Sequence, residues 1–223
     1  MEYTLTRSKR KTIALHIRNG TLEIRAPLWA PRSEIERFLI SKEKWVRDKL
    51  GKSKIQTLQR TTFTLSYGSL ILYRNKEYPL VAKEGNRIGF DGTQFYIPPS
   101  LDSDEIRSAC VQIYRKLAKI YIPQRVLILA KSMNVMPSAI KINGAKTRWG
   151  SCSIKKSINF SWRLIMADDE TIDYVIVHEL AHLTEMNHSS RFWRVVENVM
   201  PDYRKYLARL KELQSRLASE DWE

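Results

Sequence analysis

The sequence predicts an α+β protein whose first part is rich in strands and whose second part is largely helical. Short alternating runs separated by Gly, Asn and Asp recur through residues 1–98 and indicate strands. After Pro98-Pro99 the apolar residues change to helical spacing. We therefore expect a β-rich N-terminal region with one helical insertion at 1–98, and a helix-rich region at 99–223. The sequence contains no internal repeat.

The first predicted element is a β-hairpin. Two alternating runs, 12–18 and 21–27, flank Asn19-Gly20. Asn-Gly between such runs is the strongest short signal for a tight hairpin turn. His16 falls within this hairpin, and we interpret it as a structural residue.

A helix, a connector and further strands are expected next. Ser33 is a suitable cap for a helix over about 34–50, where apolar residues recur at helical spacing. The polar stretch 52–61 is expected to be a flexible connector. Gly and Asn residues then separate short strands predicted at 62–65, 71–73, 78–81, 87–90 and 94–97.

Helices dominate the predicted second region. Ser100 or Asp102 is expected to cap a long helix that reaches about Met133 and is kinked or broken near Pro123. A strand at 140–142 and a strand pair within 146–166 are expected to follow. The remaining predictions are a helix capped by Asp168 or Asp169, a helix from Ser189 or Ser190, a helix from Pro201, and a frayed acidic end at 219–223.

Composition favours a soluble cytoplasmic protein. Apolar residues make up 43% of the 223 residues, which supports an ordinary packed core. No apolar run is long enough to span a bilayer, and the N-terminus lacks the pattern of a signal peptide. Two cysteines, Cys110 and Cys152, do not make a disulfide framework, so reduced thiols are expected.

The chain is strongly basic, with a net charge of +14 and a pI near 9.8. Clusters such as Arg7-Ser8-Lys9-Arg10-Lys11 indicate either contact with nucleic acid or another polyanion, or a well-solvated surface. No helix-turn-helix, zinc-finger or RNA-recognition motif accompanies the charge. Nucleic-acid binding is therefore kept as one of two hypotheses.

Three of the four histidines lie between positions 178 and 188. His178 and His182 are four residues apart, so a helix directs both imidazoles from one face at the spacing that holds one Zn²⁺. Glu179 points to a neighbouring sector, where its carboxylate can take a proton from a metal-activated water. The pattern predicts metal-dependent hydrolysis with Glu179 as the catalytic acid–base group.

His188 is the third candidate ligand. A straight helix would carry it about 15 Å beyond His178, so the chain must turn back. Asn187 is the expected turn residue, since Asn tolerates the left-handed conformation. Three histidines with one open position are typical of catalytic zinc, and we expect one Zn²⁺ per chain, although Ni²⁺ or Co²⁺ would also suit the ligands. The competing interpretation is that His188-Ser189 only caps the next helix.

A second polar group precedes the histidines, at 146–153 and 158–164. A strand here could bind an extended peptide as an added strand, with Arg148 or Arg163 near an oxyanion or a substrate carboxylate. Equally, these arginines pack or pair locally. Tyr174, four residues before His178, is a further candidate for assisting the oxyanion, or it only packs. Cys152 is interpreted as a buried small residue.

These motifs resemble the YgjP-like metallopeptidases, which are also described as predicted metal-dependent hydrolases. The likeness covers nearly the whole chain and rests on Arg148-Trp149-Gly150-Ser151-Cys152-Ser153, His178-Glu179-Leu180-Ala181-His182, and Asn187-His188-Ser189 with Phe192-Trp193. It implies a zincin-like core in which the HExxH helix lies beside a small antiparallel sheet. It also implies metal ligands at His178, His182 and His188, and a catalytic Glu179. A more distant similarity is to the SprT-like proteases, which act on DNA-bound proteins.

Two classes of function follow. The first is a zinc metallopeptidase that acts on a peptide or protein substrate. The second is a basic nucleic-acid-binding protein with structural or vestigial zinc, and a protease acting on nucleic-acid-bound proteins would combine the two. No membrane partner is expected.

Overall fold

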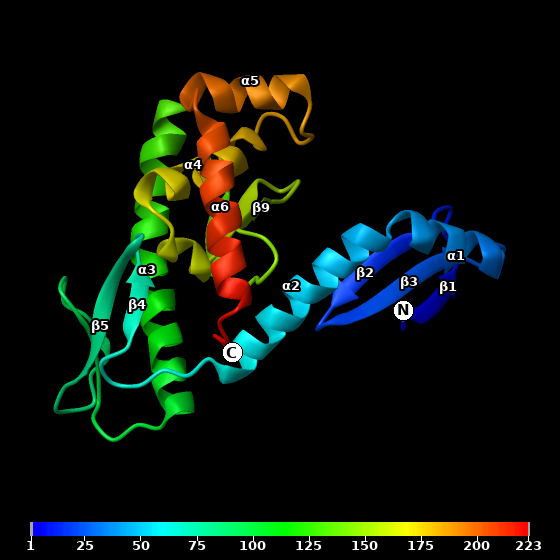
Figure 1. Cartoon of the computed structure of the whole chain (residues 1–223). Coiled ribbons are helices and arrows are strands. Elements are labelled where there is room, and N and C mark those ends of the chain that lie inside the picture. The colour runs from blue at the N-terminus through cyan, green and yellow to red at the C-terminus, as the bar shows by residue number, and fades with distance from the viewer. Residues whose placement is uncertain (1, 223) are drawn as a thin grey trace. The chain divides into compact units, whose positions relative to one another are not determined.

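The computed structural model describes residues 2–222, which form two compact units (Figure 1). The first unit comprises residues 2–63 with 217–221, and the second comprises 64–216 with Trp222. The described residues form six α-helices and three small sheets, so the predicted α+β class is confirmed. The predicted division into domains at 98/99 stays a prediction. None of the described helices is long and apolar enough to cross a membrane.

The first unit is built on a three-stranded sheet of order β1-β3-β2. β2 (Ala14–Arg18) and β3 (Thr21–Pro27) form the predicted hairpin, and Asn19 and Gly20 take the positive φ angles of 49° and 74° that its tight turn needs. β1 (Thr4–Ser8) runs parallel to β3. β1 is not among the predicted strands, because its residues are all exposed and lack an alternating apolar pattern.

Two helices occupy the residues for which one helix and a flexible connector are predicted. α1 (Arg32–Ser41) and α2 (Glu43–Thr62) are separated only by Lys42, which caps both. The predicted connector at 52–61 and the predicted strand at 62–65 are therefore wrong. Residues 52–61 are polar but contain no Gly or Pro and several good helix formers, so the helix continues without an apolar stripe. Both helices pack on the inner face of β3, where the buried core consists of Leu22, Ile24, Ala26, Ala30, Ile35 and Val46.

The second unit begins with a four-stranded sheet of order β4-β5-β7-β6. Its strands are β4 (Leu70–Tyr73), β5 (Lys76–Ala82), β6 (Gly89–Phe90) and β7 (Phe95–Ile97), close to the predicted positions. α3 (Ser103–Ser132) follows, and Asp102, one of the two predicted caps, caps it within a capping box completed by Glu105. Pro123 lies inside α3 without breaking it, so the predicted break is wrong. Buried Ile122 and Val126 hold the helix against the core on both sides of the proline.

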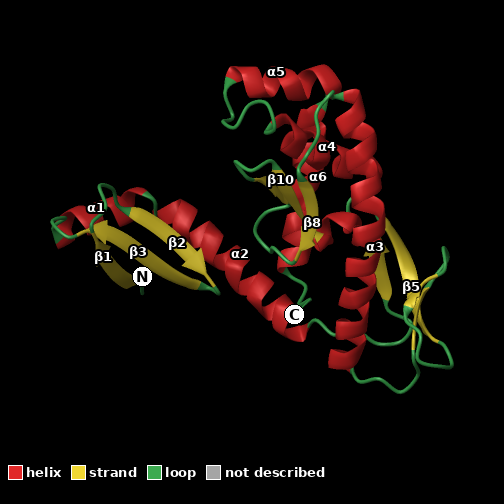
Figure 2. Cartoon of the chain, turned by 180° about the vertical axis from the view of Figure 1, so that it is seen from behind, coloured by secondary structure: helices red, strands yellow, loops and turns green. Residues whose placement is uncertain are grey.

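A second three-stranded sheet, of order β8-β10-β9, precedes the histidine-bearing helix (Figure 2). β8 (Ala139–Asn143) is parallel to β10 (Ser157–Ser161), while β9 (Gly150–Cys152) is antiparallel to β10 at the edge. The predicted strand pair within 146–166 ends at Ser161, because a buried 3₁₀ turn, η1 (Trp162–Met166), occupies the rest. The sheet is therefore mixed, with its antiparallel pair next to the helix.

Three helices complete the second unit: α4 (Asp169–Ala181), α5 (Ser190–Val199) and α6 (Tyr203–Ala218). α3 packs against α4 and η1. The expectation of a frayed end is wrong for Trp222, whose side chain is 5% exposed. Its ring lies 5.4 Å from that of Tyr114 and 6.5 Å from that of Trp162, which fixes this residue in the aromatic core.

Candidate metal centre

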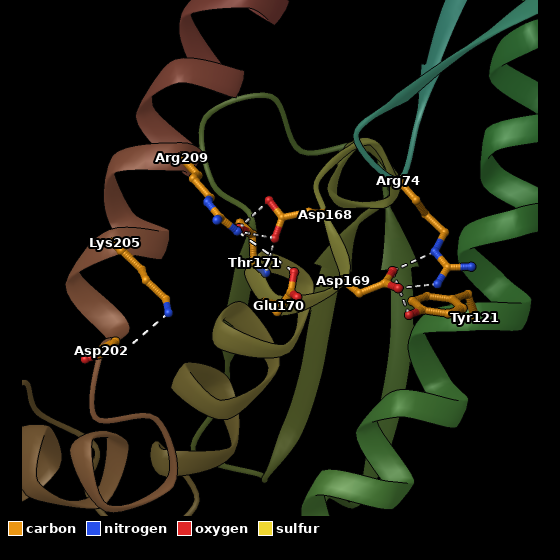
Figure 3. Close-up of polar contacts among 9 residues, drawn as sticks. All are labelled: Arg74, Tyr121, Asp168, Asp169, Glu170, Thr171, Asp202, Lys205 and Arg209. Carbon is orange, nitrogen blue, oxygen red and sulfur yellow. Dashed lines mark hydrogen bonds and ion pairs between the residues drawn. The ribbon is translucent and has the colours of Figure 1, made fainter.

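The start of α4 is held by polar side chains from α6, from α3 and from the turn between β4 and β5 (Figure 3). Asp168 caps the helix, and Arg209 of α6 donates to it at 2.9 Å. Asp169 accepts hydrogen bonds from Arg74, in the turn between β4 and β5, and from Tyr121 of α3. The bond from Arg74 holds the pKa of Asp169 below its usual value. These contacts fix the direction in which α4 leads to the histidines.

The three histidines meet at the far end of α4. The rings of His178 and His182 lie 5.0 Å apart, and His188 lies 5.0 Å from the first and 4.8 Å from the second. The Nε2 atoms of His178 and His188 are 3.1 Å apart, close to the separation of about 3.3 Å expected for two nitrogens on one tetrahedral zinc. The candidate ligand atoms of all three residues lie within 4.8 Å of one another.

The chain turns back after α4, but not in the predicted way. His182 ends the helix, and the amides of Leu183 and Thr184 donate to the carbonyls of Leu180 and Ala181 in a tight final turn. Asn187 does not have a positive φ angle, so its predicted left-handed conformation is wrong. The short turns after His182 reverse the chain instead.

The imidazoles have properties that suit a metal. Burial lowers the pKa of His178 to about 4 and also lowers that of His182, so both rings are neutral at pH 7 and keep a lone pair. His182 Nδ1 lies 3.1 Å from the carbonyl oxygen of Glu185, so Nδ1 carries the proton and Nε2 is left as the acceptor. His178 Nδ1 is buried without a hydrogen-bond partner among the described residues. The residues present therefore fit a divalent cation.

An aromatic side chain packs against all three histidines of the cluster. α5 begins just after His188 with Ser189 as its cap, and its first turn carries Phe192. The Phe192 ring lies 4.9, 4.5 and 4.7 Å from the rings of His178, His182 and His188. Phe192 is fully buried, so it restricts the orientation of all three imidazoles. No role is predicted for this residue from the sequence, although it lies only four positions after His188.

Glu179 lies in a tight space between α4 and β9. Its side chain is 6% exposed, and burial raises its pKa to about 7 while the charge of Arg148 lowers it. Gly150 of β9 faces it so closely that a Cβ there would lie 2.6 Å from Glu179 Oε1. No separate role is predicted for Gly150 from the sequence. A glycine inside a strand is nevertheless the available signal for such a close approach.

The other candidate residues have different surroundings. Arg163 is buried, donates to the carbonyl of Gly144 at 3.0 Å and stacks over Trp162. Tyr174 is 2% exposed and stacks on Tyr203 and Tyr206. Its hydroxyl has no hydrogen-bond partner among the described residues, and burial raises its pKa to about 12.

Cys152 does not join the histidine cluster, and it is partly exposed rather than buried as predicted. It lies in β9 at the edge of the sheet, where only one side of the strand is covered by β10. Burial and the charge of Glu179 both raise the pKa of its thiol, which disfavours the thiolate that a metal would need.

The converging histidines and the adjacent buried carboxylate are arranged as in a metal-dependent hydrolase. The family model of the YgjP-like metallopeptidase domain matches residues 11–213, so the chain belongs to this family. It is therefore a metal-dependent peptidase. The α+β architecture, with its HExxH helix beside a small sheet, agrees with the zincin-like core that the resemblance implies.

Similar proteins of known structure are also metallopeptidases. The zymogen of abylysin from Pyrococcus abyssi is 27% identical over 43% of this chain and 90% of its own, with a TM-score of 0.35. The zymogen of jannalysin from Methanocaldococcus jannaschii is 25% identical over 43% of this chain and 92% of its own, with a TM-score of 0.34. A search of curated proteins gave no match.

Proposed function

We propose that the chain is a zinc-dependent peptidase in which His178, His182 and His188 hold one Zn²⁺ and Glu179 is the general base. The observation that carries this proposal is the convergence of three imidazoles at the end of α4 beside a buried carboxylate. Within residues 2–222 the cluster offers three ligands rather than the four that structural zinc usually has. This supports a catalytic site over structural zinc.

Peptide hydrolysis at this site would use both the bound metal and side chains of the protein. Bound zinc would supply a Lewis acid that acidifies water and polarises the scissile carbonyl. Glu179 would accept a proton from the attacking water and pass it to the leaving amine. Arg148 already acts electrostatically on Glu179, so its charge would also stabilise negative charge on the carbonyl oxygen. Arg163 and Tyr174 would act by packing, since both are buried in contacts of their own.

The edge strand β9 offers a place for the substrate. It is the last strand of the sheet of order β8-β10-β9, and no described strand pairs with its outer edge. An extended peptide can add to such an edge through backbone hydrogen bonds. Because Gly150 of β9 faces Glu179, a peptide aligned here would run past the carboxylate. We therefore propose an extended segment of a peptide or protein as the substrate.

The ligand set is tested by metal content. Untagged wild-type protein, supplied with zinc and freed of excess metal, should hold about one zinc per chain by elemental mass spectrometry. His188→Ala should lose it or hold it much more weakly. The matched control is His16→Ala, which removes the one histidine outside the cluster and should leave zinc unchanged. Wild type without zinc, or His188→Ala with full zinc occupancy, would refute the site.

The base is tested by Glu179→Gln, measured on a quenched-fluorescence peptide library. This variant should keep its zinc and lose hydrolysis by a factor of about 10² to 10⁴, since it removes the proton acceptor. Glu185→Gln is the control, because Glu185 contacts His182 through its backbone carbonyl only. Full activity in Glu179→Gln would show that another group moves the proton.

A further inference from the structure

The positive charge of this chain is densest in the first unit. Residues 1–63 and 217–221 contain 15 Lys and Arg against 8 Asp and Glu, a net charge of +7 in 68 residues. The other 155 residues contain 23 against 16, the same net charge of +7 in more than twice the length. The peptidase site lies in the second unit, so the proposed hydrolysis does not account for the excess in the first. This excess calls for a separate ligand of opposite charge.

Most basic side chains of the first unit are free of ion pairs with described carboxylates. Four arginines do have such partners: Arg25, Arg32, Arg47 and Arg60. No ion pair to a described carboxylate is made by Lys9, Arg10, Lys11, Arg37, Lys42, Lys44, Lys49, Lys52 or Lys54. Their positive field is therefore available to an external anion.

One end of the three-stranded sheet combines this charge with exposed apolar side chains. β1 and β3 are parallel and Ser8 lies opposite Pro27, so residues that follow the two strands leave the sheet at the same end. After β1 come Lys9, Arg10 and Lys11, and after β3 come Leu28 and Trp29, which are 60% and 68% exposed. We call these five residues the basic-aromatic tip.

The loop of the tip that carries Leu28 and Trp29 is held by Arg7. Arg7 Nη1 donates to the carbonyl oxygens of Pro27, Leu28 and Ala30 at 3.0, 3.3 and 2.6 Å. Three hydrogen bonds from one guanidinium fix the loop backbone that carries Trp29. The large indole is thus presented to solvent by a rigid loop instead of folding onto the core, and such presentation lowers the entropy cost of binding.

The cations extend along a line as well as at the tip. α2 has 20 residues and so spans about 30 Å, and it carries Lys44, Lys49, Lys52 and Lys54. Trp45, Lys49 and Lys52 share one face through their i, i+4, i+7 spacing. Ile55 and Leu58 are exposed, but they are the only two apolar residues within 52–61, too few for the apolar face of a helix that lies on a membrane. A linear polyanion fits this arrangement better than a lipid surface.

We infer that the first unit binds single-stranded nucleic acid, with Trp29 stacked on a base and the lysines of the tip on phosphates. Aromatic faces next to cations are the common design of sequence-tolerant single-strand binding, because every base has a face to stack on and every nucleotide a phosphate. RNA and DNA share this chemistry. Neither the stacking nor the phosphate contacts require zinc, so this binding would persist if the peptidase site held none.

The test uses the full chain and fluorescence anisotropy at several salt concentrations. The probes are labelled 15-mers of dT and of rU, and a parallel arm measures sedimentation with vesicles of phosphatidylserine and phosphatidylcholine. Both 15-mers should bind at low salt, and the relative affinities for dT and rU identify the preferred source. Trp29→Ala should weaken binding by about 10-fold or more. Lys9→Gln with Lys11→Gln should reduce the salt slope by about 1.4, or 0.7 for each lost phosphate contact.

Matched control variants distinguish the effect of the tip residues from the effect of removing any exposed apolar side chain or any positive charge. Ile40→Ala removes another exposed apolar side chain of the first unit, 71% exposed, and should bind like wild type. Lys155→Gln with Lys156→Gln removes the same charge from an exposed turn of the second unit and should keep the slope. Trp29→Phe should restore part of the affinity. The inference fails if neither 15-mer binds at low salt, if controls and tip variants lose affinity equally, or if only vesicle binding depends on Trp29.

Discussion

Adding one methyl group at position 150 should disable the peptidase without unfolding it. In Gly150→Ala the new Cβ would lie 2.6 Å from Glu179 Oε1 and Cγ and 2.8 Å from Cδ. Ordinary contacts begin near 3.4 Å, so the carboxylate must move by about 0.8 Å. Gly150 does not have a positive φ angle, so alanine fits its backbone. The strain is therefore relieved by the flexible end of Glu179.

The size of the effect follows from that displacement. A misplacement of about 1 Å in a catalytic group costs about 10²-fold in rate. We therefore expect kcat/KM to fall by about 10²-fold, or about 2.7 kcal/mol in the activation free energy. Zinc content should stay unchanged, because the three atoms nearest to the added Cβ all belong to Glu179 and none to a histidine. Initial rates on the peptide that wild type cleaves best, with zinc measured on the same samples, give both quantities.

Gly144 supplies the matched control in the same part of the second unit. A Cβ at this position would lie 3.5 Å from Arg115 and 3.7 Å from Trp162, both ordinary contacts. Gly144→Ala should therefore keep its activity and its zinc. If Gly150→Ala were as active as wild type, Glu179 would not need its observed position, and its role as the base would be refuted. Loss of zinc from Gly150→Ala would contradict the independence of the carboxylate and the ligands.

Three further predictions concern stability and thiol reactivity. Asp169→Asn should lower the free energy of unfolding by about 1 kcal/mol at pH 7. Arg74 depresses the pKa of Asp169 in the folded state. The loss of stability should therefore be full above the pKa of about 3.9 that Asp has in the unfolded chain, and should disappear as the pH falls through the lower pKa of the folded state. Urea unfolding at pH values from 7 to 3 measures this dependence. Trp222→Ala should cost about 3 kcal/mol by the same assay, and a loss near zero would mean that the C-terminal end is not packed. Burial raises the pKa of the Cys110 thiol to about 12, so Cys110 should resist iodoacetamide in the native protein while the partly exposed Cys152 reacts. Peptide mapping identifies the modified cysteine, and modification of Cys110 before Cys152 would contradict its burial.

Local patterns in the sequence predict most of what is local in the structure. The Asn19-Gly20 hairpin, the cap at Asp102 and the start of α4 at Asp168 each depend on residues a few positions apart. The spacing of His178, His182 and His188 likewise predicts a cluster, because a helix and one reversal suffice to bring the rings together. The mechanism of the reversal was less predictable, since several short turns reach the same end and Asn187 is not left-handed.

Features that depend on distant residues could not be predicted in this way. β1 is recognisable only from its pairing with β3, since its own residues are exposed. α2 extends through residues 52–61, which contain good helix formers but lack the apolar periodicity by which a packed helix is recognised. The contact of Gly150 with Glu179 joins segments 29 residues apart, and nothing in either segment alone specifies it. The same holds for Arg74 and Asp169, which are 95 residues apart.

Charged groups are paired at the start of α4, whereas burial favours the neutral forms of the ionisable groups near its other end. This difference explains why the second end is suited to a metal. At the start, Asp168 and Asp169 face arginines and remain partly exposed, so their charges are compensated. At the other end, Glu179 and His178 are largely buried, and burial shifts the pKa of each toward its neutral form. No described cation forms an ion pair with Glu179, although Arg148 acts on it at longer range. Burying a carboxylate and several imidazole lone pairs without a partner costs free energy. A bound divalent cation would offset this cost, so metal binding would stabilise the folded protein at this end of α4.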